Sequence, residues 1–162
     1  LKVHFYDNRS YGGGTFSSDT MTIEQVSGNP LQTKDLSIST YFRNSTGMIK
    51  GSLMGEKYVE AGSKNCGVLY INNPDRFGDP RQPTDTTGYQ SWFGNSSAVL
   101  MPGEVLVTPA QYFGSADNRA INSILNIDTA TDKDYRAGAV INTKIVHIPS
   151  GQVIFDKDVV VV

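Results

Sequence analysis

Hydrophobic and polar residues alternate along several short segments of the chain, and turn-forming residues separate these segments. Alternation with a period of two is typical of β-strands that bury one face. The pattern predicts strands at residues 1–6, 21–26, 35–42, 66–71, 97–100, 104–107, 137–148 and 152–162. Residues 118–128 fit either a strand or a helix, and the alternation from Ile121 to Ile127 favours a strand.

The last part of the chain carries the most regular pattern. Two runs rich in β-branched residues flank Pro149, Ser150 and Gly151, which predicts a β-hairpin. The valines at 159–162 carry no charge to protect a strand edge, so we expect a neighbouring strand or a partner to cover them. With about eight to ten short strands in all, the sequence predicts an all-β fold, an antiparallel immunoglobulin-like β-sandwich that forms a single domain over residues 1–162.

Residues 74–97 interrupt this regularity. They are rich in Pro, Gly, Ser and Thr without a hydrophobic period, which predicts a long loop insertion. The loop contains Tyr89, Trp92 and Phe93, and aromatic residues on an exposed loop are natural contacts for a partner protein or a sugar. The alternative is that Trp92 and Phe93 fold back and fill one end of the sandwich, because large aromatic side chains are mostly buried.

Composition excludes some classes of protein. The net charge is −2 and no run of Lys or Arg is present, which argues against a nucleic-acid-binding protein. No stretch approaches the ~18 apolar residues that span a bilayer. Cys66 is the only cysteine, so no disulfide forms within the chain. The abundance of Ser, Thr and Asn agrees with short strands joined by many turns.

Residues for catalysis are sparse in the sequence. His4 and His147 each lie among apolar neighbours in a predicted strand, and no serine stands in a nucleophile elbow, so we expect neither an enzyme nor a bound cofactor. Asp128, Asp132 and Asp134 lie close together and are candidate ligands for calcium, which binds several oxygens from one loop. The alternative is a solvated acidic loop.

Three sequons, at Asn8, Asn44 and Asn95, fall in predicted turns or loops. Acceptor sites for N-glycosylation need this exposure. The three sequons therefore favour an exported glycoprotein.

Four segments of the chain follow one another in a characteristic order: residues 21–31, residues 35–38, the strand entry at 100–104 and the hairpin at 144–155. Taken in this order, they resemble archaeal type IV pilin-like proteins. The resemblance implies a β-sandwich that is the ectodomain of a surface filament subunit or of an archaellum accessory protein. It also implies a hydrophobic helix before Leu1 that forms the filament core or a membrane anchor. Because the chain begins at Leu1 inside an alternating segment, we expect it to be part of a longer protein.

These observations lead to two hypotheses about function. The first is a non-enzymatic extracellular domain on the archaeal cell surface, which acts in assembly and contact with filament subunits or the surface layer. The alternative is a carbohydrate-binding module or a viral or phage receptor-binding domain, because short strands, exposed aromatic residues and low charge suit it equally well.

Overall fold

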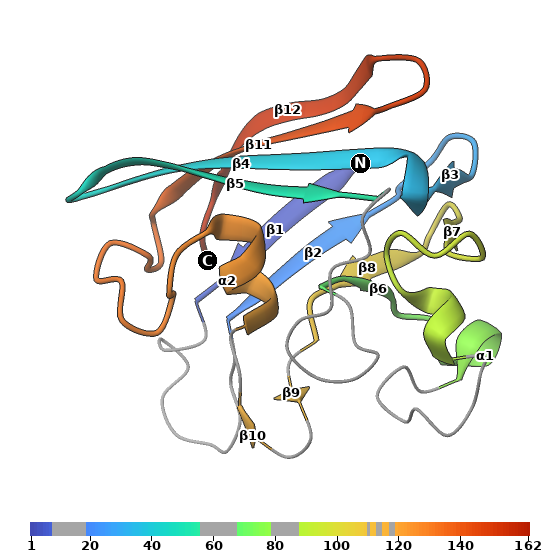
Figure 1. The fold of residues 1–162 in the computed structure, drawn as a ribbon, viewed down its shortest axis with the longest axis horizontal. Helices are drawn as coiled ribbons and strands as arrows, with labels where there is room; N and C mark the ends of the chain where they lie inside the picture. The colour runs from blue at the N-terminus through green and yellow to red at the C-terminus, as the bar shows by residue number, and fades with distance from the viewer. Residues whose placement is uncertain (8–18, 56–67, 79–87, 110, 113–114, 117–118) are drawn as a thin grey trace.

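The computed structural model describes residues 1–7, 19–55, 68–78, 88–109, 111–112, 115–116 and 119–162 (Figure 1). Asn8 and Cys66 lie outside this range. The described chain is mostly β-strand in antiparallel sheets, so the prediction of an all-β fold is confirmed. The immunoglobulin-like arrangement of its strands stays a prediction.

Two four-stranded sheets form the body of the molecule. One has the strand order β1-β2-β8-β6 and the other β12-β11-β4-β5. Two two-stranded sheets, β3-β7 and β10-β9, accompany them. The strands are β1 (Lys2–Tyr6), β2 (Thr20–Glu24), β3 (Leu31–Gln32), β4 (Leu36–Asn44), β5 (Gly47–Met54), β6 (Tyr70–Ile71), β7 (Val99–Leu100), β8 (Val105–Val107), β9 (Gln111–Tyr112), β10 (Ser115–Ala116), β11 (Val140–His147) and β12 (Gln152–Val160).

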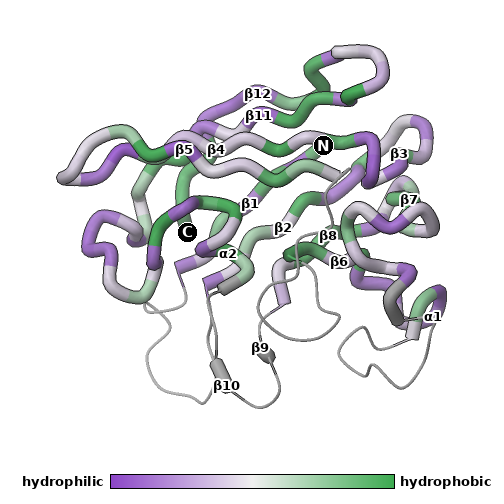
Figure 2. Tube along the Cα trace, in the orientation of Figure 1, coloured by the Kyte–Doolittle hydropathy of each residue, from purple (hydrophilic) through white to green (hydrophobic). Residues whose placement is uncertain are grey.

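The inner faces of both large sheets contribute to one hydrophobic core. Phe5, Met21 and Leu106 from the first sheet and Ile38 and Ile141 from the second are almost completely buried in it. The loop between α2 (Arg119–Leu125) and β11 is mostly hydrophilic by contrast (Figure 2). No helix among the described residues is long and apolar enough to cross a membrane.

Strand β5 is the long strand that the hydrophobic pattern does not predict. It pairs with β4 over eight residue pairs, from Ser37 opposite Met54 to Asn44 opposite Gly47. Its inward positions include Gly51, and its outward positions include two methionines, so apolar and polar residues do not alternate along it. The strand depends on its pairing with β4 and on the packing of α2 rather than on its own sequence pattern.

The prediction of a strand near residues 118–128 is wrong, because Arg119–Leu125 forms helix α2. Ala120, Ile121, Ile124 and Leu125 are all buried, and this spacing places them on one face of a helix. Short helical segments of this kind also show a period of two over a few residues, which is the reason for the error.

Helix α2 packs closely on the inner face of β4 and β5. The hydroxyl of Thr40 donates a 2.8 Å hydrogen bond to the carbonyl of Ile124 at the end of the helix. A Cβ atom at Gly51 would lie only 1.7 Å from the same carbonyl oxygen. Glycine at 51 is therefore required by the close approach of the helix.

The C-terminal hairpin of β11 and β12 is confirmed, and its end joins the two large sheets. Val161 forms a parallel bridge with Phe5 of β1. The amide of Val162 donates to the carbonyl of Phe5 at 2.9 Å, and the amide of Asp7 donates to the carbonyl of Val162 at 2.8 Å. The expectation that a neighbouring strand covers the final valines is confirmed for Val161, which is buried, whereas the side chains of Val160 and Val162 stay about half exposed.

We predict that Gly51→Ala strongly destabilises the fold. The added methyl group forces α2 away from β4 and β5, and overpacking of this kind costs about 1–3 kcal/mol. The free energy of unfolding should fall by this amount in chemical denaturation, whereas Ser52→Ala, at the exposed neighbouring position, should change it by less than about 0.5 kcal/mol. Equal stability of the two variants would contradict the close packing of α2.

Candidate functional site

The sheet β12-β11-β4-β5 has an outer face that no described helix or strand covers. The strand registers place its outward side chains in rows that run across the four strands. The outward residues are half-buried or exposed, while their neighbours along each strand point into the core. We call this set the outer face; it consists of Ser37, Ser39, Tyr41 and Arg43 on β4, Met48, Lys50, Ser52 and Met54 on β5, Val140, Asn142, Lys144 and Val146 on β11, and Val153, Asp156, Asp158 and Val160 on β12.

Apolar side chains stand at both ends of the outer face. Five of the eight exposed large hydrophobic side chains among the described residues belong to it, namely Met48, Met54, Val140, Val153 and Val160. Val140 and Val160 lie directly opposite each other across β11 and β12. Met48 stands on β5 at the same end of the sheet. Exposed apolar residues that gather on one face mark a contact surface more often than scattered ones do.

A β-bulge places Val153 on this face. Ile145 pairs with Phe155 and the next residue, Val146, pairs with Val153, so the register shifts at this point of the hairpin. Phe155 points into the core, whereas Val153 is 45% exposed. Alternation alone would place Val153 and Phe155 on the same side of β12, and the bulge separates them.

Charge is distributed unequally across the outer face. Asp156 and Asp158 lie on β12 at one edge, and Lys50 lies on β5 at the other edge. The Asp158 carboxylate accepts a 3.1 Å hydrogen bond from the Asn142 amide, and the Lys50 ammonium lies 5.7 Å from the centre of the Tyr41 ring. The edge strand β12 therefore carries the two carboxylates and the opposite edge strand β5 a lysine. Between them, Lys144 of β11 pairs with Asp156, and Arg43 of β4 pairs with Met48.

An open polar cavity of about 420 Å³ adjoins one end of the outer face. Arg43 and Val140, which belong to the outer face, line it together with Asn44, Asp134 and Arg136. The cavity lies where the β4–β5 turn meets the segment before β11. It extends the polar surface around the apolar pair Val140 and Val160.

The acidic loop after α2 holds the turn between β4 and β5. The Asp132 carboxylate accepts a 2.7 Å hydrogen bond from the Asn44 amide group, and the Asp134 carboxylate accepts one of 2.6 Å from the Ser45 amide. The Asp128 carboxylate accepts from the amide of Ala130 within its own loop. Among the described residues, no three side chains of His, Cys, Asp or Glu come together to hold a metal ion. A calcium site at these aspartates stays a prediction.

The two described sequons lie in turns, as expected. Asn44 ends β4, and its side-chain oxygen accepts hydrogen bonds from both the amide and the hydroxyl of Thr46. The side-chain oxygen of Asn95 accepts a 2.9 Å bond from the Ser97 amide. Glycosylation at Asn8, Asn44 and Asn95 stays a prediction.

The expectation that Trp92 and Phe93 contact a partner is wrong, because both are buried, with 1% and 4% of their surface exposed. Trp92 forms an antiparallel bridge with Tyr70, and the two rings meet edge to face at 5.3 Å. The amide of Phe93 donates to the carbonyl of Leu69 at 2.8 Å. The alternative that these rings fold back into the core is confirmed. The side chain of Tyr89 lies outside the described residues.

Residues 74–97 also contain more regular structure than the predicted loop. Pro74–Phe77 forms helix α1 and Gly88–Ser91 a 3₁₀ turn. The side chain of Asn73 caps α1 by accepting a hydrogen bond from the Arg76 amide. Of the two histidines, His4 is exposed on β1, and His147 hydrogen-bonds with Ser150 within the hairpin turn. That the protein is not an enzyme stays a prediction.

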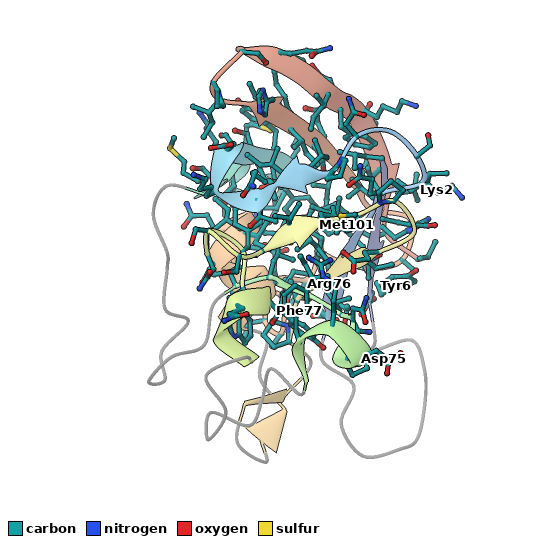
Figure 3. The ribbon with its side chains drawn as sticks, turned by 90° about the vertical axis from the view of Figure 1, so that its right-hand side faces the viewer. Lys2, Tyr6, Asp75, Arg76, Phe77 and Met101 are labelled. Atoms are coloured by element: carbon teal, nitrogen blue, oxygen red, sulfur yellow. The ribbon has the colours of Figure 1, made fainter. Side chains whose placement is uncertain are left out.

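Arg76 connects α1 to the turn between β7 and β8. Its guanidinium binds both oxygens of the Glu104 carboxylate and donates a 3.0 Å bond to the carbonyl of Val99. In Figure 3, Arg76 points from α1 toward the segment around Met101, whereas Asp75 points away. Burial by itself would raise the pKa of Glu104, but hydrogen bonds from Arg76, the Met101 amide and Asn73 outweigh burial and lower this pKa.

We predict that Glu104→Gln removes a pH-dependent part of the stability. Because the pKa of Glu104 is lower in the folded than in the unfolded chain, its contribution is present above its ordinary value of 4.5 and is lost as the pH falls through the folded pKa. At pH 7 the variant should lose about 1–2 kcal/mol. The difference from the parent chain should narrow below pH 4.5 in denaturation series. Asp75→Asn, on the exposed side of α1, is the control; a pH-independent difference for Glu104→Gln would contradict the assignment.

We predict that Asp132→Ala loosens the β4–β5 turn. The substitution removes the acceptor of the Asn44 amide and of the Asp134 and Tyr135 backbone amides. The free energy of unfolding should fall by about 1–3 kcal/mol, because part-buried donors lose their partner. Lys133→Ala, at the exposed neighbouring position, should leave thermal unfolding nearly unchanged. If the Asp132→Ala variant unfolds at the same temperature as the Lys133→Ala control, the turn does not depend on the Asp132 carboxylate.

Comparison with family models, with curated proteins and with solved structures found no match to this chain.

Proposed function

We propose that this chain is an extracellular contact domain that takes part in the assembly of a cell-surface structure. The observation that carries the proposal is the outer face of β12-β11-β4-β5, which bears five exposed large hydrophobic side chains and is not covered by any described element. The proposed role is structural and adhesive rather than catalytic.

Two features of the sequence support this location and role. The sequons at Asn8, Asn44 and Asn95 favour an exported protein. The resemblance to archaeal type IV pilin-like proteins implies a domain that is displayed on a surface filament or on an archaellum-associated protein. The proposal replaces the aromatic loop with the outer face as the contact surface, since Trp92 and Phe93 are buried. Trp92 and Phe93 are therefore not available to stack on a sugar, and the alternative of a carbohydrate-binding module would need another surface.

A contact through the outer face has a defined chemistry. Val140 and Val160 provide an apolar pair at one end. At the opposite end, Val153 and Met54 stand on the two edge strands, with Val146 and Ser37 between them in the same row. The serines of β4 and β5 between them have short side chains that allow a flat partner surface to approach. An apolar contact with a polar surround is typical of protein interfaces.

We predict that Val160→Asp weakens assembly in cells that express the complete protein. A carboxylate at this position is desolvated on contact and has no partner, so the fraction of the protein that sediments with high-mass surface material should fall at least fivefold. The estimate corresponds to about 1 kcal/mol, a small part of the cost of burying an unpaired charge.

Val26→Asp is the matched control, because Val26 is similarly exposed, at 48% against 53% for Val160, but does not belong to the outer face. Circular dichroism checks that both purified variants are folded. Equal sedimentation of the two variants with the surface material would overturn the proposed function.

A further inference from the structure

The outer face is complementary to itself, and this property identifies its partner. We infer that the outer face binds the same face of a second copy of this chain, with a two-fold axis parallel to the strands. The inference rests on the proposed function and names the partner of the same surface. It is carried by the registers of the four strands, which fix the position of every outward side chain.

The charges decide the direction of the axis. A rotation about an axis parallel to the strands places β12 of one copy over β5 of the other, and so places Asp158 over Lys50. These two residues share one row, because Asp158 pairs with Asn142, Asn142 with Tyr41, and Tyr41 with Lys50. An in-plane axis perpendicular to the strands would instead stack β12 on β12, with Asp156 and Asp158 against like charges. Like charges at an interface disfavour association, so the parallel axis is preferred.

The same rotation matches the apolar side chains. Val160 lies one row beyond Asp158, and Met48 one row beyond Lys50, so they meet across the interface. At the other end, Val153 of one copy meets Met54 of the other, since Val153 pairs with Val146, Val146 with Ser37, and Ser37 with Met54. Because the interface is two-fold, each of these contacts occurs twice.

The edges of the sheet direct association to the face rather than to strand addition. Lys157 lies on the edge strand β12 and is exposed. It pairs with the buried Thr143 of β11, so its side chain leaves β12 on the face of the sheet that is turned toward the core. The bulge at Ile145 and Val146 bends the same strand. Inward charges and bulges are features that oppose pairing of edge strands between molecules.

The size of the face sets the expected affinity. Four strands about 4.8 Å apart and about seven residues long give a face of roughly 19 by 24 Å, or about 450 Å² per copy. Both copies together bury about 900 Å², less than the 1,200–2,000 Å² of most stable complexes. We therefore expect a weak dimer with a dissociation constant on the order of 100 μM, which many copies held in one assembly would strengthen.

A charge exchange between two variants tests the inference. Sedimentation equilibrium of the purified chain, at concentrations up to about 1 mM, should show dimers. Lys50→Glu and Asp158→Lys should each raise the dissociation constant at least tenfold, because each variant faces itself with like charges. An equimolar mixture of the two should regain the affinity of the parent chain, because both contacts of the mixed dimer are then attractive. The double variant in one chain should regain it as well.

Lys2→Glu and Asp75→Lys are the controls, since they make the same changes of net charge at exposed positions outside the outer face. A parent chain that stays monomeric, or a mixture that associates no better than the separate variants, would overturn the inference. If the chain is monomeric while Val160→Asp still loses its place in the surface material, the partner of the outer face is a different protein and the proposed function stands. If Val160→Asp has no effect there, the proposed function itself fails.

Discussion

The contact between α2 and the inner face of β4 and β5 determines which face of the sheet β12-β11-β4-β5 is buried and which is exposed. The Ile124 carbonyl oxygen accepts a hydrogen bond from the Thr40 hydroxyl, and it occupies the space that a side chain at position 51 would need. The helix and the first sheet together cover the inner face, so the core forms on that side alone. Since a strand has only two faces, this one-sided burial fixes which residues of β4, β5, β11 and β12 point outward. The charge and apolar pattern of the outer face follows from this constraint.

Much of the fold could be predicted from local alternation, because β1, β2, β4 and β11 bury every second residue over most of their length. Strand β12 follows the pattern less closely, since it buries Phe155 and Val159 but leaves Lys157 exposed. Strand β5 could not, because its inward positions include a glycine that serves the packing of a distant helix. The seven residues of α2 are too few to separate a helical period from a strand period. The bulge on β12 also escapes prediction, since it depends on the pairing with β11 rather than on the sequence of either strand alone.

The candidate site was less predictable than the fold, because its residues meet through long-range contacts. Asp132 lies 88 residues from Asn44 in the sequence. The acidic cluster around Asp132 therefore does not indicate that the Asn44 side chain donates a hydrogen bond to its carboxylate. Trp92 illustrates the same limit: its loop position suggested exposure, whereas its bridge to Tyr70 buries it. The outer face can be recognised only when the registers of three strand pairs are known together. Its residues are mostly valine, serine and charged residues, and they form no sequence motif.

The protection of the sheet edges and the exposure of the sheet face form one arrangement. The last valines, which would be an unprotected edge by themselves, are paired to β1 through Val161 and Phe5. Further along β12, the edge carries Lys157 on its inward side and a bulge, so backbone pairing with another molecule is opposed where β1 no longer covers it. Of the two faces of this sheet, only the outer face has accessible apolar side chains. We therefore expect association through this sheet to depend on the complementarity of side chains rather than on pairing of the backbone.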